Sequence, residues 1–309
     1  MTTLTTAPNR TRTPRVVIVA RPTEYTDLLL RLGTRAQAEF WLASREQSLD
    51  VVEERHQNME DARDRVRRAL PREWRRAEVD RDDLDRFLFG PDDVVVCLGQ
   101  DGLVANTAKY LDGQPVIGLN PDPALYEGVL ALHEPEAITD LLLDVARDRA
   151  VVEERTMVVA RLDDGQRLLA LNELFIGHRS HQSARYRIAF GGTHERHSSS
   201  GLIVATGTGA TGWARSIDGQ RATAGRLVPP RPTDARLAFY VREPWPSVAT
   251  GTSITEGLIG GGAWLKLVSE QNHGGVVFGD GIEDDRLPFD WGRRLEIGCA
   301  EERLRLVVS

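Results

Sequence analysis

The chain has 309 residues, which is long for one domain and sufficient for two. Its formal net charge of -7 excludes a general electrostatic attraction to nucleic acid or to an anionic membrane. It contains no apolar run of about 18 residues, so no membrane-spanning helix is predicted, and a cytoplasmic location is expected. Two cysteines far apart, Cys97 and Cys299, cannot form a zinc cluster.

The first half of the chain predicts an α/β domain over residues 14–150, preceded by a disordered tail at residues 1–13. Short β-branched or apolar runs predict strands, and charged segments with helically spaced apolar residues predict helices. The order is strand, helix, strand, helix, strand and helix, with a glycine-containing turn after the second strand. The predicted elements are strands at 15–20, 92–98 and 115–120, and helices at about 35–70, 103–111 and 138–149.

The second half, residues 151–309, predicts a β-rich domain. Short alternating runs are separated by Gly, Pro, Asp and Asn, and no internal repeat is present. We expect a two-domain protein with an α/β N-terminal domain and an all-β C-terminal domain. Because clefts at domain boundaries commonly hold small molecules, we expect a nucleotide in the cleft between the two domains.

The segment CLGQDGLVANTAKYL, residues 97–111, places Asp101 between Gly99 and Gly102, directly after a buried strand. Glycine allows backbone to approach a ligand closely, and the N-terminus of the following helix attracts phosphate. A carboxylate at this point can also take a proton from an attacking hydroxyl group. The alternative interpretation is an ordinary Asp-Gly turn at the end of a strand.

The run ALNELFIG, residues 170–177, places Asn172 and Glu173 inside an apolar strand. A buried carboxylate and a buried amide need hydrogen-bond partners. The hydroxyl groups of a ligand or the local backbone could supply them, and the run by itself favours neither interpretation.

The segment 207–212 reads GTGATG and matches the dinucleotide pattern G-x-G-x-x-G. A Rossmann unit also requires a long helix, a second strand and an acidic residue about twenty residues later, and these do not follow. The segment is instead interpreted as a Gly/Thr loop that contacts a nucleotide. Two H-x-x-H spacings, His178/His181 and His194/His197, would point to opposite faces of a strand, so no metal site is predicted.

Taken together and in this order, these motifs resemble the NAD kinase family. GQDGL stands where that family has GGDGT, and PVIGLN, Asn172–Glu173 and TGTGATGW follow. The chain is most similar to the mitochondrial type in NPDP, LNELFIG, FYVREP (residues 239–244) and GGVVFGDG. The resemblance extends from about residue 14 to the C-terminus.

The resemblance implies that the protein phosphorylates NAD at the adenosine ribose 2′-hydroxyl, with ATP as donor and Mg²⁺ or another divalent cation as cofactor. Asp101 would be the general base. It also implies a homo-oligomer, a homodimer or larger. The implied nucleotide-binding residues are Gly99, Gln100, Gly102, Leu103, Asn120, Asn172, Glu173, Thr208, Gly209, Thr211, Gly212, Trp213 and Ser216.

Three residues depart from the family pattern. Gln100 replaces the second glycine of GGDGT, Leu103 replaces its threonine, and Ala210 replaces a serine. Loss of polar partners can reduce the rate by large factors. Two alternatives therefore remain: an NAD(P)-binding paralogue with impaired catalysis, and a kinase for another hydroxyl acceptor such as a nucleoside, sugar or lipid.

Overall fold

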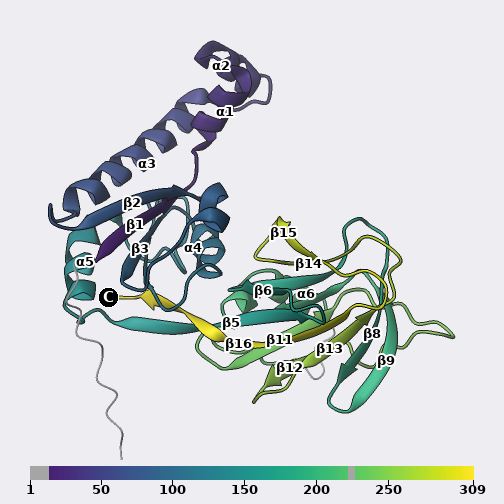
Figure 1. Cartoon of the computed structure of the whole chain (residues 1–309). Coiled ribbons are helices and arrows are strands. Elements are labelled where there is room, and N and C mark those ends of the chain that lie inside the picture. The colour runs from purple at the N-terminus through teal and green to yellow at the C-terminus, as the bar shows by residue number, and fades with distance from the viewer. Residues whose placement is uncertain (1–13, 222–226) are drawn as a thin grey trace, which may run out of the picture. The chain divides into compact units, whose positions relative to one another are not determined.

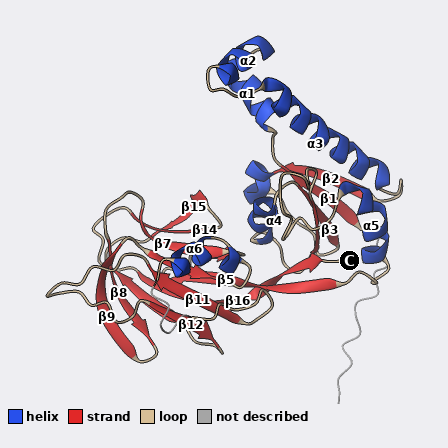
Figure 2. Cartoon of the chain, turned by 180° about the vertical axis from the view of Figure 1, so that it is seen from behind, coloured by secondary structure: helices blue, strands red, loops and turns tan. Residues whose placement is uncertain are grey.

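The structure, a computed structural model, describes residues 14–221 and 227–309, and the predicted tail at residues 1–13 lies outside them. The chain forms two compact units. Unit 1 contains the described residues up to Tyr110, Gln114–Val152 and the terminal Leu306–Ser309, whereas unit 2 contains Leu111–Gly113 and Glu153–Arg305. As expected, the first is an α/β unit and the second is mostly β (Figures 1 and 2).

The sheet of unit 1 has the strand order β2-β1-β3-β4, with all neighbours parallel. All residues of β3 and β4 are buried, because helices and loops cover both faces of a parallel sheet. Helices α3 and α5 pack on the sheet through Val66, Ile138 and Leu142. The strands are β1 (Arg15–Ala20), β2 (Arg75–Asp80), β3 (Asp93–Leu98) and β4 (Pro115–Leu119); α5 is Ile138–Ala146.

The single helix predicted over residues 35–70 is wrong, because the segment forms two helices, and a further helix precedes them. These are α1 (Glu24–Leu32), α2 (Arg35–Ala43) and α3 (Leu49–Ala69). The break lies near Glu46, whose positive φ of 58° cannot continue a right-handed helix. Strand β2 was not predicted, since its sequence RRAEVD is charged and buries only Val79 on a sheet edge.

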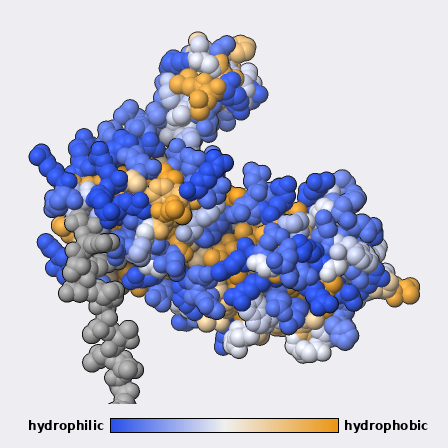
Figure 3. All heavy atoms as spheres, in the orientation of Figure 1, coloured by the Kyte–Doolittle hydropathy of each residue, from blue (hydrophilic) through white to orange (hydrophobic). Residues whose placement is uncertain are grey.

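Helices α1, α2 and the first turns of α3 form an arm that extends away from the sheet of unit 1 (Figure 1). A small core that includes Leu28, Leu42 and Val52 holds the arm together. Figure 3 shows hydrophobic residues gathered at its outer end. The side chains of Leu30 in α1 and Phe40 in α2 are about 80% exposed.

Unit 2 is a sandwich of two antiparallel layers around one core. One sheet has the order β12-β11-β10-β7-β14-β15. The other contains β16-β13-β8-β9, with β5 beside β16 and β6 beside β5. The strands are β5 (Val152–Leu162), β6 (Arg167–Ala170), β7 (Glu173–His178), β8 (Ala184–Phe190), β9 (Thr193–Ser199), β10 (Leu202–Ala205), β11 (Arg236–Val241), β12 (Glu256–Gly260), β13 (Leu265–Ser269), β14 (Gly275–Gly279), β15 (Ile282–Pro288) and β16 (Arg294–Val307).

The apolar run at residues 167–177 is divided between β6 and β7, and the break falls at Leu171 and Asn172. This break brings the Asn-Glu pair to the beginning of a strand rather than its middle. In the part of the chain that the structure describes, no helix is long and apolar enough to cross a membrane.

Candidate functional site

Asp101 is the first residue of helix α4 (Asp101–Ala108), which follows β3 and the turn at Gly99 and Gln100. Its carboxylate accepts hydrogen bonds from the backbone of a loop that follows β4. Oδ1 accepts from the N–H groups of Leu130 and Ala131, both at 2.9 Å, and Oδ2 accepts from Val129 N–H at 2.9 Å. Asp101 therefore fixes this loop against the helix, while Oδ2 retains a lone pair for a further partner.

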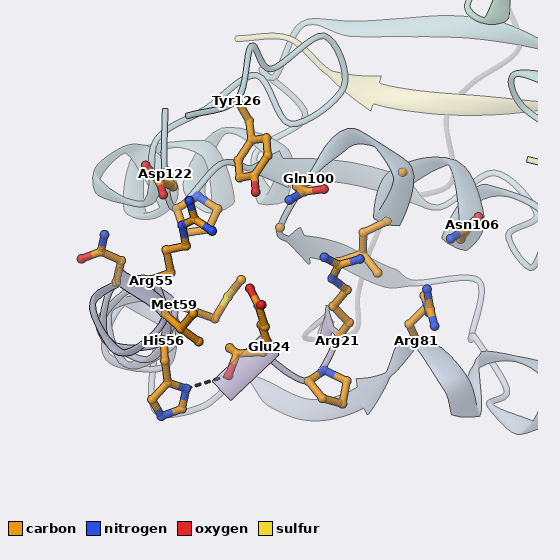
Figure 4. A pocket seen from close by; sticks show the side chains of 18 residues that line it. Arg21, Glu24, Arg55, His56, Met59, Arg81, Gln100, Asn106, Asp122 and Tyr126 are labelled. Atoms are coloured by element: carbon orange, nitrogen blue, oxygen red, sulfur yellow. Dashed lines mark hydrogen bonds between the residues drawn. The ribbon is translucent and has the colours of Figure 1, made fainter. Parts of the chain in front are cut away.

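A pocket of about 180 Å³ opens beside this turn, within unit 1 (Figure 4). It lies at the carboxyl ends of the parallel strands, where ligands bind in open α/β sheets. Arg21 follows β1, Arg55 lies on α3 and Arg81 follows β2, so three elements bring guanidinium groups to its wall. Arg81 pairs with Asp82, whereas no described residue pairs with Arg21 or Arg55. The pocket is suited to an anion.

Gln100 and Leu103, two of the departures from the family pattern, both line this pocket. Gln100 is the N-cap residue of α4, but its side chain makes no capping hydrogen bond. Leu103 is only 4% exposed. One helical turn after Leu103, the side chain of Asn106 is 8% exposed, and its buried Oδ1 has no partner among the described residues. Asn106 was not predicted, because the run LVANTA is otherwise typical of a buried helix.

Asn120 is buried, and both ends of its amide are used by the loop after β4. Its Nδ2 donates to the carbonyl of Tyr126 at 2.8 Å, and its Oδ1 accepts from Asp122 N–H at 3.0 Å. Its role as a direct nucleotide contact therefore stays a prediction. What Asn120 does in the structure is to order the loop that Asp101 also holds.

In unit 2, the peptide from Leu171 to Glu173 is held on two sides. On one side, the carboxylate of Asp280, in the turn between β14 and β15, accepts hydrogen bonds from the N–H groups of this peptide segment. Thr206 holds the carbonyls: its N–H donates to Asn172 O at 2.9 Å and its hydroxyl donates to Leu171 O at 2.5 Å. Asp280 lies in the GDG turn, yet that short sequence gave no reason to place it beside residues about 110 positions earlier.

The Glu173 carboxyl group is partly buried, and no described residue donates a hydrogen bond to it. Burial, and secondarily the negative charge of Asp280, raise its pKa to about 7. Farther along β7, the ring of Phe175 stacks on Trp213 with 5.8 Å between centroids, and the Arg242 guanidinium lies over the Trp213 ring, 5.2 Å from its centroid. A polar pair beside stacked aromatic rings can bind a nucleoside.

The Gly/Thr loop follows β10 and leads into α6 (Trp213–Gly219). Thr208 is buried, and its hydroxyl has no partner among the described residues. The Thr211 hydroxyl donates to Thr208 O at 3.2 Å, while Gly212 precedes α6 and Ser216 is exposed on it. The loop thus places an unpaired hydroxyl group close to the Asn-Glu pair, which Gly209 contacts.

Gly209→Ala is expected to destabilise the protein. A Cβ atom at this position would lie 2.1 Å from the backbone oxygen of Asn172, so the loop or the Asn-Glu pair must move. Such overpacking typically costs about 1–3 kcal/mol of unfolding free energy. Chemical denaturation measures it, with Gly219→Ala as the control, since a Cβ atom there meets nothing within 4 Å. Equal stability of the two variants would contradict the prediction.

The structure thus gathers the predicted residues into two sets. Gly99, Gln100, Asp101, Gly102, Leu103 and Asn120 lie in unit 1, and Asn172, Glu173, Thr208, Gly209, Thr211, Gly212, Trp213 and Ser216 lie in unit 2. The sequence did not single out Arg21, Arg55, Asn106, Asp280 or the loop 129–131. Among the described residues, no group of three His, Cys, Asp or Glu side chains could hold a metal ion.

Comparison with known proteins finds local sequence similarity to NAD kinases. The chain is 32% identical over 134 residues to the NAD kinase of Bacteroides fragilis. It is 31% identical over 178 residues to the rat protein named NAD kinase 2, mitochondrial. The first match covers 41% of this chain and 45% of the relative, so the chain spans about half the length of the curated relatives it matches. No family model matches.

Similarity of fold extends over nearly the whole chain. Yeast NADH kinase in complex with NADH superposes with a TM-score of 0.60 at 16% identity, covering 98% of this chain and 88% of the yeast chain. An NAD kinase from Archaeoglobus fulgidus in complex with ATP gives a TM-score of 0.59 at 19% identity, covering 95% and 93%. The ordered motifs and the local sequence identity are therefore similar to those of NAD kinases, and the chain has the fold of the NAD and NADH kinases with which it superposes.

Proposed function

We propose that this protein transfers the terminal phosphoryl group of ATP to the adenosine ribose 2′-hydroxyl of NAD and produces NADP. The observation that carries the proposal is the placement of Asp101 at the N-terminus of α4, beside a pocket lined by Arg21 and Arg55. A relative and two similar structures are named NAD or NADH kinases, which supports the acceptor, and one of these structures contains ATP, which supports the donor.

In the proposed reaction the NAD 2′-oxygen attacks the γ-phosphorus of ATP. The bond between the 2′-oxygen and phosphorus forms, the bond from phosphorus to the β-phosphate oxygen breaks, and ADP leaves. Asp101 accepts the hydroxyl proton on Oδ2, the oxygen with only one hydrogen bond from the loop. Arg21, Arg55 and the N-terminus of α4 balance the phosphate charge.

The pocket also suits Mg²⁺ carried on the donor phosphates. Mg²⁺ prefers oxygen ligands and is commonly held by substrate phosphates with one or two carboxylates. Glu24 and Asp122 line the pocket with carboxylates. The ion would neutralise charge on the transferred phosphoryl group.

Gln100 and Leu103 favour a second candidate: a protein that binds NAD or NADP but does not transfer phosphate. A glutamine side chain occupies the pocket where the family glycine leaves room for phosphate, and the buried Leu103 offers no hydroxyl group. Both replacements remove contacts that a transferring phosphoryl group uses.

The two candidates differ in products. Purified protein would be incubated with NAD, ATP and MgCl₂, and NADP and ADP would be measured together. Equal amounts of both support the kinase. A ligand stabilises the state that it binds, so NAD should raise the melting temperature of a protein that binds it. Such a shift, together with no NADP or ADP at any donor concentration, supports the binding protein. If no NADP forms with NAD, but ADP is released when a nucleoside, sugar or lipid replaces NAD, the result supports another acceptor.

Asn172→Ala and Glu173→Ala are each expected to weaken NAD binding by roughly 5- to 150-fold, because each removes a side chain that, in the proposed complex, forms a hydrogen bond with NAD. Titration calorimetry measures the effect. Gln182→Ala is the matched control, since Gln182 is exposed on the segment that follows β7. Unchanged affinity in both folded variants would remove the pair from the binding site.

The proposal has three further parts: the chain is of the mitochondrial type, which the similarity to the rat protein supports, it forms a homodimer, and it acts in the cytoplasm. Light scattering coupled to size-exclusion chromatography tests the homodimer directly. A mass equal to one chain of 34.3 kDa would contradict it.

A further inference from the structure

Asp280 makes an unusual set of contacts for a turn residue. Its Oδ2 accepts from Leu171 N–H at 2.8 Å, and its Oδ1 accepts from the N–H groups of Asn172 at 2.7 Å and Glu173 at 3.3 Å. Its own N–H donates to Glu173 O at 3.1 Å. One side chain thus binds three successive peptide groups of a segment more than 100 residues earlier.

The position of this segment explains why it needs such a partner. Residues 171 and 172 lie in the break between β6 and β7, where no strand ladder satisfies the peptide N–H groups. Asp280 supplies acceptors for three of them, and hydrogen bonds to a charged acceptor are stronger than neutral ones. Without them, the backbone that carries Asn172 and Glu173 would be free to rotate.

The turn itself is built for this contact. Asp280 adopts a positive φ of 52°, which is uncommon for any residue other than glycine and more accessible to aspartate than to most. It is flanked by Gly279 and Gly281, which join β14 to β15. Strand β14 pairs with β7, so the turn is anchored to the same strand that begins with Glu173.

We propose that Asp280 is the positioning residue of the NAD site: by holding the peptide from Leu171 to Glu173, it fixes the direction in which Asn172 and Glu173 face the dinucleotide. The inference rests on the proposed function, in which these two side chains bind NAD. Asp280 acts through them, because its two carboxylate oxygens are engaged by the backbone N–H groups of this segment.

A second effect of Asp280 provides an independent readout. Its charge contributes, after burial, to the raised pKa of Glu173. On the neighbouring strand β10, Glu173 pairs with the uncharged Ala205, so Asp280 is the charged influence resolved on this carboxyl group. Removal of that charge should lower the pKa of Glu173 from about 7 toward its ordinary value, although burial remains.

The test is Asp280→Asn, which keeps the size of the side chain and removes its charge. The matched control is Asp284→Asn, because Asp284 is exposed on the adjoining strand β15. Three quantities are measured: NAD affinity by calorimetry, the Glu173 titration by carboxyl NMR, and hydrogen exchange of amides 171–173. We expect NAD affinity to fall roughly 10- to 100-fold, the titration midpoint to move down, and exchange to accelerate. The control should change none of them.

Unchanged NAD affinity in folded Asp280→Asn overturns the proposal. If the wild type itself binds no NAD, the proposed function fails, and amide exchange in the free protein still decides whether Asp280 holds the segment. If Asp280→Asn does not fold, Asp280→Glu takes its place, since it keeps the charge but moves the two oxygens away from the N–H groups of Leu171 and Asn172. Unaltered NAD affinity and amide exchange in that variant would likewise overturn the proposal.

Discussion

Asp101→Asn should abolish NADP formation while NAD still binds. The amide is nearly isosteric with the carboxylate, but it cannot accept a proton, and loss of a general base typically reduces the rate by ~10²- to 10⁴-fold. The structure makes this substitution more informative than the sequence did. An asparagine Oδ1 can still accept the hydrogen bonds from Leu130 and Ala131, so the loop should keep most of its order.

Asp101→Ala separates the two roles of the side chain. It removes the acceptors for Val129, Leu130 and Ala131 as well as the proton acceptor, so amide exchange in this loop should accelerate in the alanine variant and much less in the asparagine variant. Asp140→Asn, at an exposed position of α5, is the control for the change of charge. Full activity of the Asp101→Asn variant would show that Asp101 is not the general base. Its role would then be limited to holding the loop.

The double substitution Gln100→Gly and Leu103→Thr should raise the rate of NADP formation. Glycine at position 100 removes the side chain that lines the phosphate pocket, and threonine at position 103 adds a hydroxyl in the first turn of α4. A hydrogen bond to a charged group is worth about 1.5–3 kcal/mol, so one contact recovered in the transition state corresponds to roughly 10- to 150-fold. The ratio kcat/KM for ATP is the measurement.

Burial of Leu103 means that the two changes must also be examined separately. Its side chain is 4% exposed, so a shorter, polar threonine leaves a gap and is expected to cost stability. Gln100 makes no capping hydrogen bond, and its replacement by glycine should cost only a few tenths of a kcal/mol. Denaturation curves for each single variant show whether a lower reaction rate is due to a larger unfolded fraction of the protein.

A slower but fully folded double variant would show that Gln100 and Leu103 are adaptations to a different donor or acceptor. In that case Asn106 becomes the residue to change next, because its unpaired Oδ1 lies one helical turn from Leu103 in the same pocket. If both proteins bind NAD but transfer nothing from any donor, the binding function is the correct one.

The class of fold and most of the motif positions could be predicted from the amino-acid sequence. A continuous apolar run such as DVVVCL is buried on both faces of a parallel sheet, and β3 occupies those residues. The Asp101 turn, the Asn-Glu pair and the Gly/Thr loop could be located because each is a local pattern of glycine or polar residues at the end of an apolar run. Charged elements such as β2, and the break between α2 and α3, carry no such local signal.

The contacts that those motifs make became apparent only from the three-dimensional fold. Asp101 meets the backbone of residues 129–131, Arg55 reaches the pocket from a separate helix, and Asp280 binds residues 171–173. Backbone amides are present in every residue, so a sequence cannot reveal which of them a distant carboxylate will bind. Such hydrogen bonds depend on which distant segments of the chain lie side by side. The packing of strands and helices around each core determines this, and no local sequence pattern does.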